Sequence, residues 1–157
     1  MGIKKASLAK LSRPKLGEVY ARERLFALLQ GSPNCPITFV SGPAGSGKTT
    51  LVANFLDRCN DASIWFQADA GDSDPATFFH YLGLAAKQAA PRRKQPMPVL
   101  SPDHLPSIQL FARRFFEALY QRIKRPGYLI FDDYQQVLCP TSLRTNHRVS
   151  SLKIIRE

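Results

Sequence analysis

The 157-residue sequence contains little cysteine and no long apolar run. Its three cysteines, Cys35, Cys59 and Cys139, are widely spaced and form no CxxC pair. This argues against a disulfide framework and a zinc site, and it favours a reducing, cytoplasmic location. No apolar stretch approaches the roughly 18 residues that a membrane-spanning helix needs, so we expect no membrane partner. The basic N-terminus is followed by no apolar stretch and is not typical of a secretory signal.

Hydrophobic residues make up 44% of the chain and charged residues 22%, a balance that favours a globular core over a disordered chain. The formal net charge is +10, and it is unevenly distributed. Residues 1–30 and 91–126 carry the basic excess, whereas residues 31–90 are slightly acidic. Two interpretations stay open: a surface that binds nucleic acid or another polyanion, or the solvated faces of a leader and a helix.

Short apolar runs alternate with amphipathic segments, which predicts an α/β fold with a parallel sheet flanked by helices. The expected strands are 37–40, 63–66 and 128–131, and the first of them is expected to be buried. The expected helices are 20–29, 48–58, 75–90 and 107–124. Asp74 is the expected cap of the third helix and Pro75 its first residue. Residues 91–106 are predicted to form a proline-rich surface loop, and residues 150–157 the start of another helix.

A glycine-rich stretch after the first strand matches the phosphate-binding pattern GxxxxGK[ST]. Its residues, with the threonine that follows, are Gly42, Pro43, Ala44, Gly45, Ser46, Gly47, Lys48, Thr49 and Thr50. The glycines let backbone N–H groups approach phosphate oxygens, and the following helix directs further N–H groups to the same anion. We therefore expect a site for ATP, with Lys48 on its β- and γ-phosphates and the Thr49 hydroxyl on Mg²⁺.

The strand at 128–131 ends in two aspartates, Asp132 and Asp133. The carboxyl ends of parallel strands line the crevice in which α/β sheets bind ligands. We expect Asp132 to hold Mg²⁺ and Asp133 to polarise the water that attacks the γ-phosphate. Asp133 and Lys48 are therefore the predicted catalytic residues.

Four segments, in this order, resemble the signal-transduction ATPases with numerous domains (STAND). Within that family they are most similar to the LuxR-type transcriptional regulators that include the maltose-regulon activator. The segments are Lys10–Pro14 with Arg22–Leu25, the phosphate loop Ser41–Thr50, Trp65 with Asp69, Asp72, Phe78 and Leu82, and Leu129–Tyr134.

The resemblance implies an ATP-driven switch that sets whether a transcriptional regulator is closed or self-assembled through its nucleotide domain. DNA would be bound only by a C-terminal domain that this sequence does not contain. The resemblance also implies that residues of the family's entry segment lie near the adenine, which would place Arg22 there. Gln135 stands where the family usually has histidine, and we expect Trp65 to belong to the core.

The resemblance covers about residues 10–136, so we divide the chain into a basic leader (1–17), a partial P-loop NTPase domain (18–136) and a divergent tail (137–157). In the family, a further strand lies between the phosphate-loop strand and the aspartate strand, and we expect it to be missing here. The expectation is then a truncated, C-terminally incomplete domain with a gap in the middle of its sheet and with weak or no ATP hydrolysis.

Two other functions stay open. A small-molecule P-loop kinase would need an acceptor pocket and a basic lid, for which the candidates are Arg92, Arg93 and Lys94, but no acidic residue accompanies them to act as a base. A basic nucleic-acid-binding protein would use residues 1–30 and 91–126, which lack interleaved aromatic residues and a known recognition motif.

Overall fold

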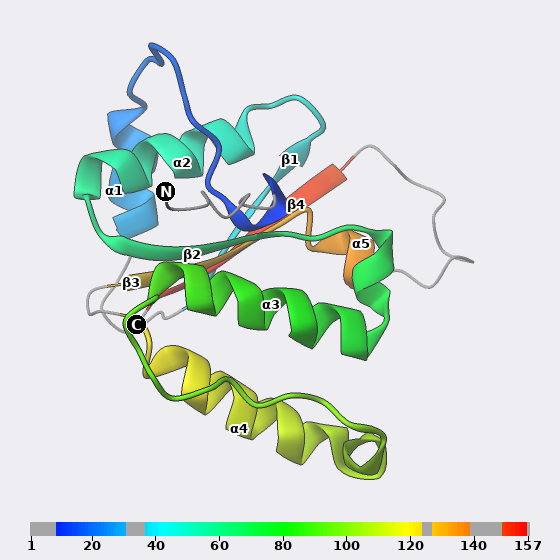
Figure 1. Ribbon diagram of the computed structural model, residues 1–157. Coiled ribbons are helices and arrows are strands. Elements are labelled where there is room, and N and C mark those ends of the chain that lie inside the picture. The colour runs from blue at the N-terminus through cyan, green and yellow to red at the C-terminus, as the bar shows by residue number, and fades with distance from the viewer. Residues whose placement is uncertain (1–8, 31–36, 124–126, 139–148, 157) are drawn as a thin grey trace.

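The computed structural model describes residues 9–30, 37–123, 127–138 and 149–156. One four-stranded sheet lies between two layers of helices (Figure 1). The strands, in their order across the sheet, are β1 (Ile37–Pro43), β4 (Val149–Arg156), β3 (Gly127–Asp132) and β2 (Ala62–Gln67). Helices α1 (Glu23–Gln30) and α2 (Lys48–Cys59) cover one face, and α3 (Pro75–Ala89) and α4 (Ile108–Tyr120) cover the other. The predicted α/β class is confirmed.

Except for the helix expected at 150–157, the predicted helices and strands lie close to their expected positions. The side chain of Asp74 accepts a hydrogen bond from the Thr77 N–H at 2.9 Å, and Pro75 is the first residue of α3, as the sequence predicts. The helix expected at 107–124 is instead preceded by a 3₁₀ helix, η3 (Pro102–Ser107), and α4 ends at Tyr120. Two further 3₁₀ helices are η1 (Ala9–Leu11) and η2 (Ala70–Ser73), and a short helix α5 (Gln135–Leu138) follows β3.

Strand β4 occupies the middle of the sheet, so the predicted gap and the predicted helix at 150–157 are both wrong. It pairs antiparallel with β1 and with β3, and Ile154 lies opposite both Thr38 and Ile130. Strands β1, β2 and β3 all point in the same direction, and β4 alone runs against them. An open position between two strands would leave two rows of backbone N–H and C=O groups unpaired. Residues 149–155 pair with β1 and residues 153–156 pair with β3, which satisfies these groups along the paired segments.

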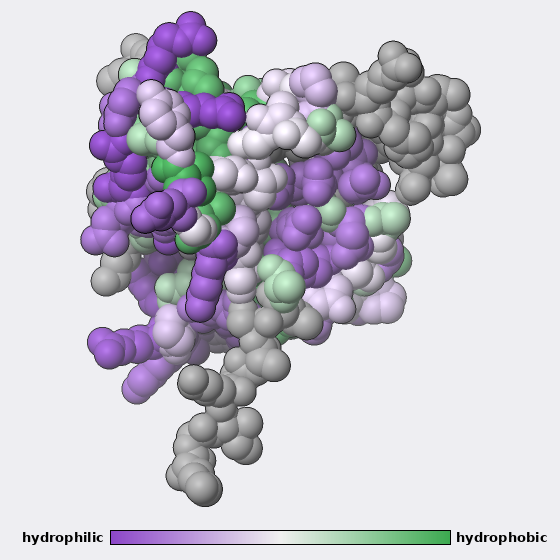
Figure 2. All heavy atoms as spheres, turned by 90° about the horizontal axis from the view of Figure 1, so that it is seen from above, coloured by the Kyte–Doolittle hydropathy of each residue, from purple (hydrophilic) through white to green (hydrophobic). Residues whose placement is uncertain are grey.

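Strand β1 is an edge strand, and the prediction that it is buried is wrong. Its residues alternate between exposed and half-buried, and the Phe39 side chain is 63% exposed. The cause is its place at the end of the strand order, where β4 is its one neighbour in the sheet among the described residues. Seen from above the α1–α2 layer, the surface is mostly hydrophilic, with hydrophobic residues gathered in a strip (Figure 2).

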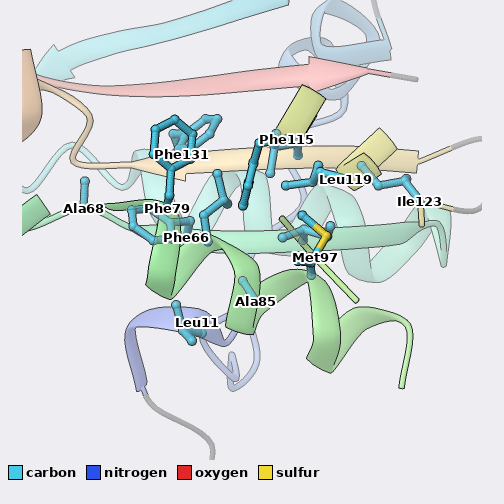
Figure 3. Close-up of a cluster of buried hydrophobic side chains, with 14 of the residues drawn as sticks. Leu11, Phe66, Ala68, Phe79, Ala85, Met97, Phe115, Leu119, Ile123 and Phe131 are labelled. Atoms are coloured by element: carbon cyan, nitrogen blue, oxygen red, sulfur yellow. The ribbon is translucent and has the colours of Figure 1, made fainter. Parts of the chain in front are cut away.

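Side chains from the two faces of the sheet form two separate cores. On the α3–α4 face, aromatic side chains dominate, and the rings of Phe79 and Phe115 lie 4.9 Å apart between centroids (Figure 3). On the α1–α2 face, Trp65 is 3% exposed and belongs to the same cluster as Ile154. The prediction that Trp65 is a core residue is confirmed.

Parts of the basic segments are built into the fold. Residues 9–14, predicted as extended leader, contain η1, and Leu11 is 5% exposed within the α3–α4 core. Arg13 pairs with Asp57 of α2 at 2.8 Å. Arg122 is buried and donates a hydrogen bond to the carbonyl of Gln95. These cations neutralise or cap groups of the domain itself, which favours a structural role over a polyanion-binding one.

Within the described ranges, no helix is both long enough and apolar enough to cross a membrane. Of the three cysteines, Cys59 forms no disulfide within the described residues, and Cys35 and Cys139 lie outside them.

Replacing Ile154 by alanine tests whether β4 belongs to the sheet. Ile154 is 3% exposed in the α1–α2 core, so Ile154→Ala is expected to lower the free energy of unfolding by about 2–5 kcal/mol. Urea denaturation measures the change. The matched control is Leu28→Ala on α1, where the side chain is 65% exposed, and its effect should stay within about 0.5 kcal/mol. Equal effects of the two variants would contradict the position of β4.

Candidate nucleotide site

The phosphate loop connects the end of β1 to the start of α2 and has the backbone shape that its glycines predict. Gly45 and Gly47 adopt φ values of 78° and 80°, in the left-handed region that other residues rarely enter. Gly47 is also the N-cap of α2 and has no side chain with which to cap the helix. The first N–H groups of α2 are therefore left for an anion, and the helix dipole favours negative charge at the same place.

The ammonium group of Lys48 lies over the loop. Its Nζ donates hydrogen bonds to the carbonyls of Gly42 and Pro43, at 3.2 and 2.8 Å, and to the Ser46 hydroxyl at 3.2 Å. All three acceptors are neutral. Because a phosphate oxygen carries a negative charge that these acceptors lack, it attracts the ammonium group more strongly and can replace them. Lys48 thus lies at the phosphate loop, and its contact with the β- and γ-phosphates stays a prediction.

Thr49 and Asp132 meet although they lie 83 residues apart in the sequence. The Thr49 hydroxyl lies 3.1 and 2.9 Å from the two carboxylate oxygens of Asp132, the last residue of β3. Asp132 is 3% exposed, and burial raises the pKa of its carboxyl, with the charge of Asp133 adding to the rise. A buried carboxylate beside a hydroxyl is the hard-oxygen donor set that Mg²⁺ prefers. These two residues therefore fit the predicted Mg²⁺ site.

Asp133 has an unusual backbone conformation. Its φ is 54°, in the left-handed region, which costs free energy for any residue with a Cβ. Gln135 Nε2 donates to Asp133 Oδ1 at 3.2 Å, and the Gln136 N–H donates to the Asp133 carbonyl at 2.9 Å. The turn after β3 thus holds the Asp133 side chain half-exposed at the same edge of the sheet as Asp132.

Arg22 also lies at the phosphate loop. One of its terminal guanidinium nitrogens is 3.7 Å from the position that a Cβ on Gly47 would occupy. The carbonyl of Arg22 accepts hydrogen bonds from the N–H groups of Leu25 and Phe26, so the start of α1 fixes its backbone. Its role near the adenine stays a prediction.

The structure brings most of the predicted site residues together and separates the kinase candidates from them. Lys48, Thr49 and Thr50 form the first turn of α2, Pro43 and Ala44 lie exposed in the loop, and Asp132 closes the site. In contrast, residues 92–94 follow the C-terminal end of α3. Because α3 starts at the carboxyl edge of the sheet and runs back, its end lies at the opposite edge. This geometry does not support a basic lid over the phosphates.

One cluster near the site was not predicted. Lys10 pairs with Asp69 and Asp72, which the resemblance includes without giving them a partner. Among the residues that the structure describes, no group of three or more His, Cys, Asp or Glu side chains forms a further metal site.

Comparisons with known proteins place this geometry in a family context. Residues 18–152 match the AAA ATPase domain family. Two curated relatives are the HTH-type transcriptional regulators MalT from two strains of Klebsiella pneumoniae. Each is 38% identical over 136 residues, which cover 84% of this chain and 15% of the relative. The chain therefore spans a small part of the length of these regulators.

Asp132→Asn tests the cost of burying the Asp132 charge. Because folding raises the pKa of Asp132, its contribution favours the folded state below the ordinary value of 3.8 and is lost as pH rises past the raised value. In EDTA near neutral pH, we expect Asp132→Asn to raise the free energy of unfolding by about 0.5–2 kcal/mol. The gain should shrink as the pH is lowered, because the wild-type carboxyl then takes up a proton.

Urea denaturation across the pH range measures this gain. Asp103→Asn, at an exposed position of η3, is the control and should show no such pH-dependent gain. A loss of stability in Asp132→Asn near neutral pH would show that the Asp132 carboxylate stabilises the metal-free fold instead.

Proposed function

This chain belongs to the AAA ATPase domain family, and we propose that it is the ATP–Mg²⁺-binding module of an ATP-dependent transcriptional regulator related to MalT. In this proposal, the bound nucleotide acts as a switch that controls whether the protein self-associates through its nucleotide domain. DNA would be bound by a different part of the regulator, and the protein would act in the cytoplasm.

The observation that carries the proposal is the contact between the phosphate loop and Asp132. The Thr49 hydroxyl, in the first turn of α2, already lies within 3.1 Å of both Asp132 carboxylate oxygens. Lys48, one residue earlier, lies over the loop. The side chains proposed to bind phosphate and metal, Lys48, Thr49 and Asp132, therefore lie close to one another in the fold.

Each residue has a distinct part in binding ATP. The N–H groups at the start of α2 donate to phosphate oxygens, and Lys48 adds a positive charge close to the β- and γ-phosphates. Thr49 and Asp132 would hold Mg²⁺ through oxygen ligands. When bound, Mg²⁺ neutralises the negative charge that develops on the phosphates. Arg22, whose guanidinium group lies close to Gly47, is proposed to contact the nucleotide.

Asp133 is the proposed general base for hydrolysis. It would accept a proton from the water that attacks the γ-phosphate. In the structure, the Gln135 amide donates to Asp133 Oδ1 and occupies one of the positions that a water would need. This supports a slow turnover, as suits a protein whose bound nucleotide acts as a switch.

Lys48→Ala tests the phosphate site. The substitution removes the positive charge facing the phosphates, so ATP binding is expected to weaken by about 1.5–3 kcal/mol, or roughly 10- to 150-fold. Titration with a fluorescent ATP analogue in Mg²⁺ measures this affinity. Lys87→Ala, which removes an exposed lysine near the end of α3, should bind like the wild type. Undiminished affinity in Lys48→Ala would refute the assignment of the loop.

Asp133→Asn separates binding from hydrolysis. Asparagine tolerates the left-handed backbone as aspartate does, so the turn should keep its shape. ATP affinity is expected to stay close to that of the wild type, and phosphate release should fall by about 10²–10⁴-fold. Any wild-type turnover must first be measured under single-turnover conditions. If Asp133→Asn hydrolyses ATP at the wild-type rate, Asp133 is not the base.

A further inference from the structure

The leader contributes a cation to the loop that follows β2. Lys10 Nζ lies 2.7 Å from Asp69 Oδ2 and 2.9 Å from both carboxylate oxygens of Asp72. The same ammonium lies 4.5 Å from the centroid of the Tyr81 ring, on α3. One lysine thus contacts the N-cap and the third residue of η2 and a side chain of α3, all of which lie roughly 60 to 70 residues later in the sequence.

Asp72 needs this cation because its side chain is fully buried. Its carboxylate also accepts a hydrogen bond from the Asp69 N–H at 2.8 Å, and Lys10 is its ion-pair partner among the described residues. Partial burial lowers the pKa of Lys10, but the hydrogen bonds to Asp69 and Asp72 outweigh it and raise the pKa above its ordinary value. Lys10 also lowers the pKa of Asp69. Both shifts favour the charged forms of Lys10 and Asp69 and so favour the ion pair between them.

The loop that Lys10 holds is joined directly to the magnesium aspartate. The N–H of Ala68, the residue before Asp69, donates to the backbone carbonyl of Asp132 at 2.8 Å. Helix η2 also packs against α5, which follows Asp133. The hydrogen bond from Ala68 therefore connects the loop held by Lys10 to the backbone of Asp132. The packing of η2 against α5 connects the same loop to the turn that carries Asp133.

The same leader is attached to the phosphate-loop side of the site. Three residues after Lys10, Arg13 pairs with Asp57 of α2, the helix that carries Lys48 and Thr49. Beyond the leader, Arg22 lies at the phosphate loop itself. The leader thus contacts both halves of the proposed site, the half that binds phosphate and the half that binds metal.

We propose that Lys10 is a positioning residue for the Mg²⁺ site: by holding residues 69–72 it fixes the backbone of Asp132 relative to Thr49. This inference rests on the proposed function. Lys10 touches neither nucleotide nor metal, so its effect is on the gain in ATP affinity that Mg²⁺ gives, and not on the contacts between the phosphate loop and the phosphates. The basic charge at Lys10 serves the domain itself and is not available to a polyanion.

The test compares ATP affinity in Mg²⁺ and in EDTA for the full chain and its variants. In Lys10→Met, the ratio of the two dissociation constants is expected to fall by about two- to thirtyfold, while the affinity in EDTA is unchanged. Lys10→Arg keeps the positive charge and should recover most of the ratio. Lys15→Met removes an exposed lysine from the same leader and should match the wild type. A merely structural role would lower the melting temperature of Lys10→Met without changing the ratio.

A second measurement does not depend on whether Lys10→Met folds. Coupling between sites is reciprocal, so Mg²⁺–ATP must restrain the loop as much as the loop restrains the site. Hydrogen exchange of wild-type residues 62–72 should therefore be slower in Mg²⁺ with ATP than in EDTA with ATP.

The outcomes separate this inference from the proposed function. An unchanged ratio in folded Lys10→Met, or unchanged exchange in the wild type, would overturn the role of Lys10 while Mg²⁺-dependent ATP binding stands. Absence of ATP binding by the wild type would overturn the proposed function itself.

Discussion

The contact of the Thr49 hydroxyl with the Asp132 carboxylate is the interaction on which the proposed site depends, and the sheet determines whether it can form. Thr49 follows β1 through the phosphate loop, and Asp132 ends β3. These two strands are not neighbours, because β4 lies between them. Since neighbouring strands lie about 4.8 Å apart, β4 holds β1 and β3 roughly 10 Å from each other. Residues 149–156 therefore set the width of the site.

The electrostatics of the metal-free site suit a ligand of mixed charge. Asp132 is buried beside Asp133, and its ionised form is disfavoured there, as the raised pKa shows. Lys48 donates hydrogen bonds to two carbonyls and a hydroxyl, all of which are neutral. A metal–phosphate complex would supply a cation to Asp132 and phosphate anions to Lys48. Residues that bind such a ligand well are expected to stabilise the empty protein poorly, which is the usual trade-off at functional sites.

The features that could be predicted from the sequence are those encoded by neighbouring residues. The phosphate loop needs glycines and a lysine at fixed spacing, Asp74-Pro75 caps α3, and Asp132 directly follows an apolar run. The features that could not be predicted depend on residues far apart. Residues 149–156 pair as β4 because two strands present open edges there, and β1 is exposed because it lies at the end of the strand order. Lys10 has no local pattern that reveals its partners, which lie 59 and 62 residues later.

Calorimetric titration of the purified wild-type chain with ATP, first in Mg²⁺ and then in EDTA, tests the central claim most directly. If Lys48 and the phosphate loop bind the phosphates while Thr49 and Asp132 bind the metal, the chain takes up one ATP and binds it more tightly in Mg²⁺. ATP binding of equal strength in EDTA would contradict the metal half of the site. The absence of ATP binding under both conditions would contradict the site as a whole.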